Sequence, residues 1–263
     1  WKPTSPEEVV GDECVTLTLA RQCDRLACYD PNLQKNPFAE FGAMLESSLI
    51  DGPPGTGKTT RFRMMMTRIA MRAEQVGVPY VFKSVTADQV KNEWYGKSAQ
   101  LIAQLLEGVK DPQVLALMCV DDIDLLLTGD RGAAGTSGAD LDILKALMDF
   151  FSGTGTDYTG NYLTVAATNK PTATEDALRQ RFVYRAIIEG PKSRDEYIRL
   201  VAQELKGFEK TGRLKVSGNV ITPKILGKGT LIFPEDIMKR YAGKGGSWND
   251  IGALCAELRV KDP

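Results

Sequence analysis

The 263-residue chain contains no histidine. This absence excludes Ser-His-Asp and Cys-His catalysis, and it excludes zinc sites built on imidazole ligands. Five cysteines are present, an odd number, and no two of them are spaced as a CxxC pair. We therefore expect reduced, mostly buried thiols in an intracellular protein, in the cytoplasm or, as an alternative, in an organelle interior.

Long apolar runs and an excess of one charge are also missing. No run approaches the ~20 residues that a membrane-spanning helix needs, so no span is expected in this chain. Lys and Arg number 33 against 34 Asp and Glu, which leaves no general basic field and disfavours nucleic acid as a partner. The hydrophobic fraction of 43% is enough for a sizeable core. Because the chain begins at Trp1 and not at Met, we expect a piece of a longer protein.

Short apolar runs alternate with helical patterns over the first 190 residues. Runs typical of buried strands lie at 49–50, 80–82, 114–120, 162–167 and 184–188. Helical periodicity occurs at 15–26, 60–76, 99–109 and 139–151. This alternation predicts a parallel sheet with helices on both faces.

After Gly190-Pro191 the strand patterns disappear. Helices are expected at 193–206, 222–227, 234–242 and 247–259. The sequence therefore predicts an α/β domain over residues 1–190, followed by a small all-helical domain over residues 191–263.

Residues 52–59, Gly-Pro-Pro-Gly-Thr-Gly-Lys-Thr, match the GxxxxGK[ST] pattern in full. In such a loop backbone N–H groups converge on a phosphate, and the following helix adds its N-terminal dipole. The lysine reaches the β- and γ-phosphates of a nucleotide, and the final hydroxyl binds Mg²⁺. The predicted nucleotide-binding residues are Pro54, Gly55, Thr56, Gly57, Lys58, Thr59 and Thr60, with Thr59 also a metal ligand. A simple glycine-proline turn is the alternative, which the strand and helix patterns on either side disfavour.

Two acidic residues, Asp121 and Asp122, follow directly on an apolar run. A carboxylate at the C-terminal tip of a buried strand lies where parallel sheets place their ligands. We predict that Asp121 orients Mg²⁺ through water and that Asp122 polarises an attacking water. The alternative is that adjacent acids only cap a strand end.

These motifs resemble those of the AAA+ ATPases, and within them the AAA subfamily to which spastin and katanin belong. The resemblance covers nearly the whole chain and implies a P-loop NTPase fold with a small helical lid. Residues 120–124 look like the subfamily's Asp-Glu-Ile-Asp box, but Asp122 stands at the position of the catalytic glutamate. Because aspartate is shorter by one methylene, this departure implies slower hydrolysis. Rubisco activases, another AAA+ branch, also carry aspartate there, which gives a fainter second resemblance.

The resemblance implies catalytic roles for three further residues. Residues 164–169 resemble the sensor-1 strand, which places Asn169 beside the γ-phosphate; without the family, Asn169 is an ordinary turn residue. Residues 176–182 resemble the segment that carries arginine fingers, and we assign that role to Arg179 and Arg181. Which arginine is the principal finger stays open. Solvated arginines at a helix end are the alternative.

A spastin-type pore loop resembles residues 91–98, Lys-Asn-Glu-Trp-Tyr-Gly-Lys-Ser. The resemblance implies that Trp94 grips an extended peptide in a central pore, with Tyr95 beside it. The alternative is that both aromatic residues pack under a loop as minor core, because Trp is mostly buried in proteins.

Weaker resemblances concern the adenine site. Val10 and Gly11 resemble a dipeptide whose backbone borders adenine, and residues 245–251 resemble the start of the lid helix. Trp248 departs from the small residues of the family there, so that it either stacks on adenine or crowds it. Ser247 and Asp250 are explained equally well as a helix-capping pattern.

The resulting functional prediction is a Mg²⁺-dependent ATPase whose ring, a homo-oligomer expected to be a hexamer, threads or remodels a protein substrate. The alternatives are a Rubisco-activase-like remodeller of one metabolic complex, and a nucleotide-switched scaffold or loader with slow hydrolysis. One basic run falls on the helix after the phosphate loop, with Arg61, Arg63, Arg68 and Arg72. It fits subunit contacts as well as nucleic acid, and the sequence does not name a substrate.

Overall fold

The structure, a computed structural model, describes residues 3–86, 108–124, 158–169 and 179–193, together with 196, 199–200, 203, 214–217 and 220–223. The chain forms two compact units. The first comprises residues 1–6, 14–52 and 58–187, and the second comprises residues 7–13, 53–57 and 188–263. The domain boundary expected after residue 190 stays a prediction.

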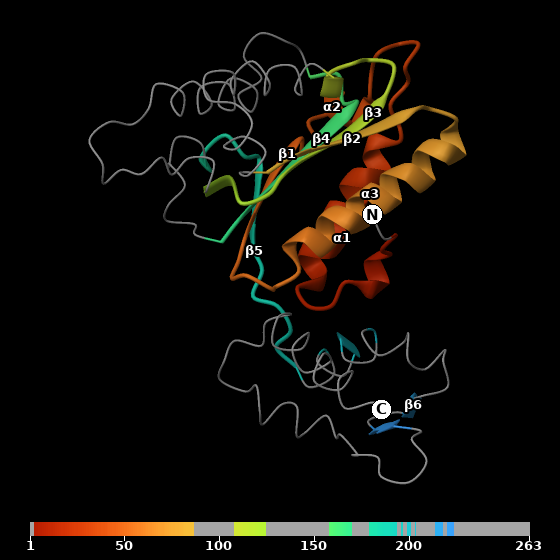
Figure 1. Ribbon diagram of the computed structural model, residues 1–263. Coiled ribbons are helices and arrows are strands. Elements are labelled where there is room, and N and C mark those ends of the chain that lie inside the picture. Colours follow the sequence, from red (N-terminus) through yellow and green to blue (C-terminus); the bar gives the residue numbers. More distant parts are fainter. Residues whose placement is uncertain are drawn as a thin grey trace, which may run out of the picture. The chain divides into compact units, whose positions relative to one another are not determined.

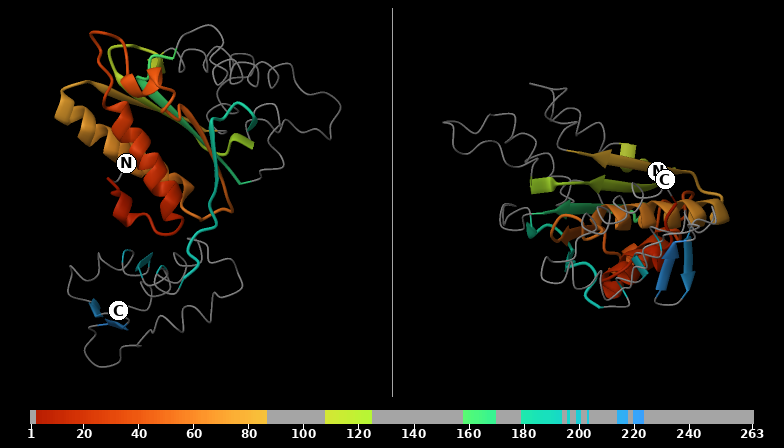
Figure 2. Two further views of the ribbon diagram at one scale, coloured as in Figure 1. Left: turned by 180° about the vertical axis from the view of Figure 1, so that it is seen from behind. Right: turned by 60° about the horizontal axis from the view of Figure 1, so that its bottom comes forward.

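Five strands form one parallel sheet in the first unit (Figure 1). They are β1 (Ser47–Asp51), β2 (Tyr80–Val85), β3 (Leu115–Val120), β4 (Tyr162–Thr168) and β5 (Tyr184–Ile187). Their order is β2-β3-β4-β1-β5, and every neighbouring pair is parallel. The arrows of β2, β3 and β4 accordingly point the same way in the right-hand view of Figure 2. The strands predicted from the apolar runs are confirmed.

Burial explains why these runs are apolar without alternation. Every residue of the three inner strands β1, β3 and β4 is buried, whereas both edge strands include exposed residues. A strand covered on both faces needs apolar or small side chains at all its positions. An ionisable residue in such a strand is therefore informative, and Asp51 at the end of β1 is one.

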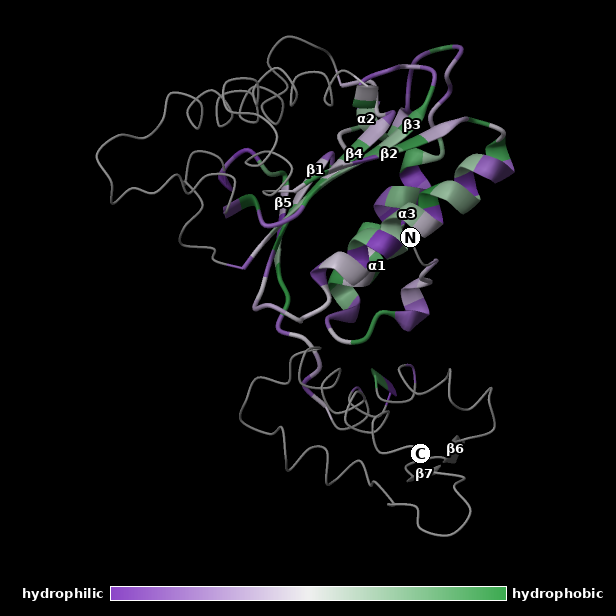
Figure 3. Cartoon of the chain, viewed as in Figure 1, coloured by the Kyte–Doolittle hydropathy of each residue, from purple (hydrophilic) through white to green (hydrophobic). Residues whose placement is uncertain are grey.

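Two long helices, α1 (Glu13–Leu26) and α3 (Lys58–Val76), lie side by side on one face of the sheet (Figures 1 and 2). Both mix hydrophobic and hydrophilic residues along their length, as helices that cover a sheet do (Figure 3). They confirm the helices predicted at 15–26 and 60–76, and a short helix, α2 (Pro37–Glu40), was not predicted. The other helices expected before residue 190 lie outside the described residues, except for helical residues 108–109. None of the described helices is long and apolar enough to cross a membrane.

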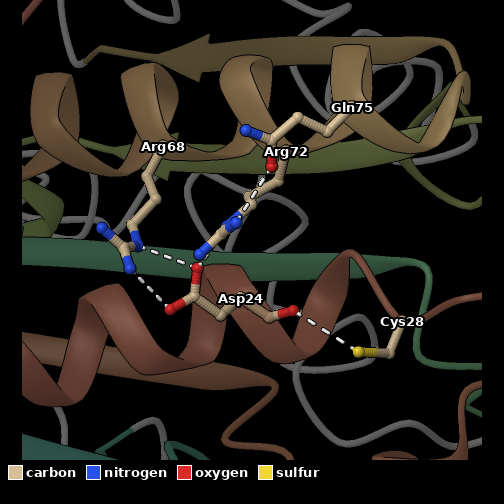
Figure 4. A network of polar contacts seen from close by, with 5 residues as sticks. All are labelled: Asp24, Cys28, Arg68, Arg72 and Gln75. Atoms are coloured by element: carbon tan, nitrogen blue, oxygen red, sulfur yellow. Dashed lines mark hydrogen bonds and ion pairs between the residues drawn. The ribbon is translucent and has the colours of Figure 1, made fainter.

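The carboxylate of Asp24 holds the two long helices together (Figure 4). It accepts hydrogen bonds from Nε and Nη2 of Arg68 at 2.9 and 2.7 Å, and from Nε of Arg72 at 2.8 Å. Partial burial alone would raise the pKa of Asp24, but the two guanidinium groups outweigh it and lower the pKa. Since Arg61 is fully buried as well, the basic run of this helix offers little free charge to a nucleic acid.

The cysteine prediction is correct in part. The four described cysteines are free thiols, and Cys23 and Cys119 are buried as expected. Burial raises the pKa of both buried thiols far above the ordinary value. Cys14 and Cys28 are exposed, so the expectation of mostly buried thiols is wrong for these two.

The expectation that strands end at residue 190 is wrong. β6 (Leu214–Ser217) and β7 (Val220–Pro223) pair antiparallel, and β7 overlaps the helix expected at 222–227. The signal was present, because Gly218-Asn219 separates two short apolar-polar runs in a way that favours hairpins. The other helices expected after residue 206 lie outside the described residues.

Gly160, just before β4, should tolerate no side chain. Its φ is +81°, and a Cβ there would overlap the Cβ atoms of Asn36 and Ala39. Asn36 cannot move aside easily, because it is fully buried and its Nδ2 donates to the carbonyl oxygens of Arg25 at 2.9 Å and Gly160 at 3.0 Å. We expect Gly160→Ala to lower the free energy of unfolding through backbone strain and through this overlap. The overlap should add about 1–3 kcal/mol to the cost of the strain.

Gly77 provides the matched control for that prediction. Its φ is +71°, but no atom lies within 4 Å of a Cβ placed there. Gly77→Ala should therefore cost only the strain, about 1–2 kcal/mol. Urea unfolding of both variants measures the difference. Equal losses of stability would contradict the proposed overlap.

Candidate functional site

The side chain of Lys58, the first residue of α3, reaches the residue that follows β1. Its side chain is buried, and Nζ donates a 2.7 Å hydrogen bond to the carbonyl oxygen of Gly52. Burial lowers the pKa of Lys58, while the nearby carboxylates, chiefly Asp121 and Asp122, oppose the shift. A buried ammonium with its aim fixed by backbone is suited to binding an anion such as a phosphate.

The turn of the phosphate loop, residues 53–57, belongs to the second unit. Gly55 and Gly57 have φ values of +79° and +92°, which side chains rarely permit. The hydroxyl of Thr56 donates to the carbonyl oxygen of Pro53 at 2.8 Å and closes the turn. The backbone thus has the conformation that the glycines of the motif imply.

Thr59 and Asp121 are adjacent, as the metal-site prediction requires. The Thr59 hydroxyl donates to Oδ2 of Asp121 at 3.1 Å, and Oδ1 of the same carboxylate accepts the backbone N–H of Asp122 at 3.1 Å. A hydroxyl beside a carboxylate supplies the oxygen ligands that Mg²⁺ prefers, with phosphates and waters completing its octahedron. Among the described residues no group of three or more acids or thiols forms a protein cage for a metal. The pair therefore fits Mg²⁺ held together with a phosphate.

Asp122 and Asn169 are also in direct contact. The Nδ2 group of Asn169 donates to Oδ1 of Asp122, whose φ of +49° is unusual for a residue other than glycine. Backbone strain of this kind gathers at functional sites. Oδ1 of Asn169 is buried and has no hydrogen-bond partner among the described residues. The Asn169 side chain thus binds the Asp122 carboxylate through Nδ2, while its Oδ1 stays available as an acceptor for another group.

The Asp124 side chain holds the carboxyl end of β4 in place. Its carboxylate is buried and accepts from the Thr168 hydroxyl at 2.9 Å and from the backbone N–H of Asn169 at 3.4 Å. A role for Asp124 does not follow from the sequence alone. Its contacts explain how the amide of Asn169 is positioned.

The two arginines predicted as fingers precede β5. The Nη2 atom of Arg179 lies 3.7 Å from Oδ2 of Asp51 in the same chain. The backbone on either side of residue 182 is tied to Ser47, whose hydroxyl donates to the Arg181 carbonyl at 3.2 Å and accepts from Val183 N–H at 3.1 Å. Asp51 was missed from the sequence, although an acid directly after the apolar pair Leu49-Ile50 was a usable signal.

Residues 10–12 are tied to the segment after β5, and both belong to the second unit. The Asp12 carboxylate accepts from the backbone N–H groups of Glu189 at 3.0 Å and Gly190 at 3.1 Å. A Cβ on Gly11 would lie only 3.0 Å from the carbonyl carbon of Gly190. Val10 is buried. The adenine contacts of Val10 and Gly11 stay predictions, and Asp12, which holds their neighbourhood, was missed.

Three predicted site residues, Trp94, Tyr95 and Trp248, lie outside the described residues, so their roles stay predictions.

Comparisons with known proteins agree with this geometry. The model of the ATPase family associated with various cellular activities (AAA) matches residues 48–189. The chain is 29% identical over 199 residues to ATPase-like fidgetin of Schizosaccharomyces pombe, covering 73% of this chain and 28% of that protein. It is 26% identical over 184 residues to spastin of Dictyostelium discoideum, covering 70% and 26%.

A solved structure shows the same fold. The FIGL-1 AAA domain in complex with ADP superposes with a TM-score of 0.64 and 23% identity, covering 97% of this chain and 74% of that one. The chain spans about a quarter of the length of the curated relatives named here. The family match over more than half of its residues, together with the parallel sheet that carries the phosphate loop, shows that the chain belongs to the AAA ATPase family.

Proposed function

We propose that the protein hydrolyses ATP with Mg²⁺ and uses the energy to remodel a protein. The observation that carries the proposal is the meeting of three groups at the carboxyl ends of β1, β3 and β4. These groups are the Lys58 ammonium on Gly52, the Thr59–Asp121 pair and the Asp122–Asn169 pair. Each part of phosphoryl transfer, namely phosphate binding, metal binding and orientation of water, has a side chain there.

The chemistry assigns one task to each residue. Lys58 binds the β- and γ-phosphates, while Thr59 and Asp121 hold Mg²⁺, which neutralises phosphate charge when bound. Asp122 accepts a hydrogen bond from the attacking water and orients it toward the γ-phosphate. Asn169 fixes the carboxylate through Nδ2 and offers its buried Oδ1 to the same water.

The assembly in the same proposal is a homo-oligomeric ring, with six subunits. Arg179 and Arg181 of one subunit stabilise charge on the nucleotide of the next, so the site is complete only at an interface. Val10, Gly11 and Trp248 border adenine, and Trp94 with Tyr95 grips the protein substrate in the pore. We place the protein in the cytoplasm, because its described cysteines are free thiols.

Trp94→Ala separates a motor from a nucleotide switch. We expect the variant to keep basal ATP hydrolysis and its melting temperature, and to lose stimulation of hydrolysis by an unfolded polypeptide such as casein. The reason is that an indole in a pore supplies apolar contact to a passing chain and none to the fold. Phe41→Ala is the control, because Phe41 is an aromatic residue with 86% exposure and no predicted role in the pore.

Two other results would count against threading. A variant that is still stimulated like wild type would favour the nucleotide-switched scaffold. A variant that loses ~3–5 kcal/mol of stability, with every activity reduced together, would place Trp94 in the core. Absence of ATP hydrolysis in the wild-type protein with Mg²⁺ would overturn the proposed function itself.

A further inference from the structure

Asp51 is a buried carboxylate to which no step of ATP hydrolysis has been assigned. It ends β1, one residue before the phosphate loop, and is 7% exposed. Its Oδ1 atom is buried and has no hydrogen-bond partner among the described residues. A buried charge is costly unless it is paired, so its presence in a strand that is buried at every position calls for a partner.

Arg179 is that partner, through the 3.7 Å ion pair with Oδ2. The arginine is itself only partly satisfied, because its Nε is buried without a hydrogen bond within the part of the chain that the structure describes. Burial raises the pKa of Asp51, while the positive charges of Arg179 and then Lys58 lower it. Burial outweighs both cations, so the pKa of Asp51 is raised overall, and Arg179 is the stronger of the two opposing influences.

Strand β1 holds the arginine segment at both of its ends. At the start of the strand, the Ser47 hydroxyl is bonded to the backbone at Arg181 and Val183. At its other end, Asp51 attracts the guanidinium of Arg179. Asp51 is followed directly by Gly52, whose carbonyl oxygen accepts from Lys58 Nζ at 2.7 Å.

We propose that Asp51 is a positioning residue for Arg179: its carboxylate aims the guanidinium so that the arginine can act on the nucleotide of the neighbouring subunit. This inference rests on the proposed function, in which Arg179 acts across an interface. Ser47 fixes the backbone of the segment, and Asp51 fixes its charged tip. An arginine without this carboxylate keeps its charge but samples many rotamers, which lowers its effect on the transition state.

Asp51→Asn tests the proposal in the full chain, because asparagine has nearly the same shape and no charge. The expected result is a fall in kcat of about tenfold or more, with the KM for ATP nearly unchanged. The double variant with Arg179→Ala should be no slower than Arg179→Ala alone, because both changes remove one function. Asp51→Glu, which restores the charge, should recover part of the rate.

Mixed rings show on which site Asp51 acts. Lys58→Ala chains bind no ATP but keep Asp51 and Arg179, so they can complete the nucleotide site of an Asp51→Asn neighbour. Mixing the two variants should restore hydrolysis. If Asp51 served Lys58 of its own chain instead, mixing would restore nothing. A parallel mixture of Arg179→Ala with Lys58→Ala reports whether the arginine acts across the interface at all.

Asp24→Asn is the matched control, since it also removes a carboxylate that pairs with arginines, here between α1 and α3. It should lower the melting temperature and leave kcat unchanged.

The outcomes separate the two proposals. Wild-type kcat in a folded Asp51→Asn variant overturns the positioning role and leaves the ATPase proposal intact. Rate losses that multiply in the double variant of Asp51→Asn and Arg179→Ala also overturn the positioning role. The same follows if hydrolysis recovers in the mixture with Arg179→Ala but not in the mixture with Asp51→Asn. If neither mixture recovers despite co-assembly, the trans-acting arginine is wrong, and the double variant still decides whether Asp51 acts through Arg179. Should Asp51→Asn not fold, Asp51→Ser repeats the test, and failure of both to fold makes Asp51 a structural anchor and overturns the proposal.

Discussion

Replacing Lys58 with alanine should abolish measurable ATP binding. Lys58 is the only buried lysine among the described residues, and its Nζ is already aimed by the Gly52 carbonyl. Hydrogen bonds to charged groups contribute about 1.5–3 kcal/mol each, and the ammonium meets both the β- and γ-phosphates. Loss of two such contacts weakens binding by at least about a hundredfold. Titration calorimetry with a slowly hydrolysed ATP analogue measures the effect.

Lys35→Ala is the control for that measurement. Lys35 is exposed and paired with Glu40 at 2.9 Å, so its removal changes one positive charge without touching the loop. Its affinity for the nucleotide should equal that of the wild type. If Lys58→Ala, with a normal melting temperature, bound ATP as tightly as Lys35→Ala, the phosphate-loop assignment would be wrong.

Asp122→Asn should leave Mg²⁺-ATP binding intact and reduce turnover by about 10²–10⁴-fold, the usual contribution of a general base. In the wild type the Asn169 amide donates to Oδ1 of the Asp122 carboxylate, and the proposed role requires the same carboxylate to accept from water. An asparagine side chain brings its own donors into this place and cannot take up a proton. Steady-state ATPase rates and nucleotide affinity, measured on the same preparation, separate chemistry from binding.

Asp111→Asn is the control, because Asp111 is an exposed acid whose carboxylate accepts from Gln113 N–H at 2.9 Å in a turn. Turnover near the wild-type rate in Asp122→Asn would indicate that Asp121 or Asp124 orients the attacking water instead. It would also leave the strained φ of Asp122 without a functional explanation.

Local patterns were enough to predict the elements that carry the phosphate site. The run at 114–120 is apolar at nearly every position because β3 is buried throughout. The motif at 52–59 is compatible with few backbone conformations. Lys58, Thr59 and Asp121 follow from that motif and from the acid after β3. The meeting of Asp122 with Asn169 required the family resemblance, because an Asn after a strand is ambiguous alone.

Residues that act through long-range partners were missed. The role of Asp51 depends on Arg179, and that of Asp12 depends on backbone N–H groups at residues 189–190. No periodicity or spacing within a short window reports such pairs. The β6–β7 hairpin was missed although its Gly-Asn signal is local, because a helix was expected at 222–227, where β7 ends.

The position of β1 in the sheet has a consequence for synthesis of the chain. Its partners β4 and β5 are encoded far downstream, with Asp51 paired to Thr168 and Ile187. At a translation rate of about 5–20 residues per second, β1 waits roughly ten seconds after leaving the ribosome before either partner exists. During that interval both backbone edges of β1 are unpaired and prone to association. The nascent chain is therefore expected to depend on a ribosome-bound chaperone until β4 has emerged.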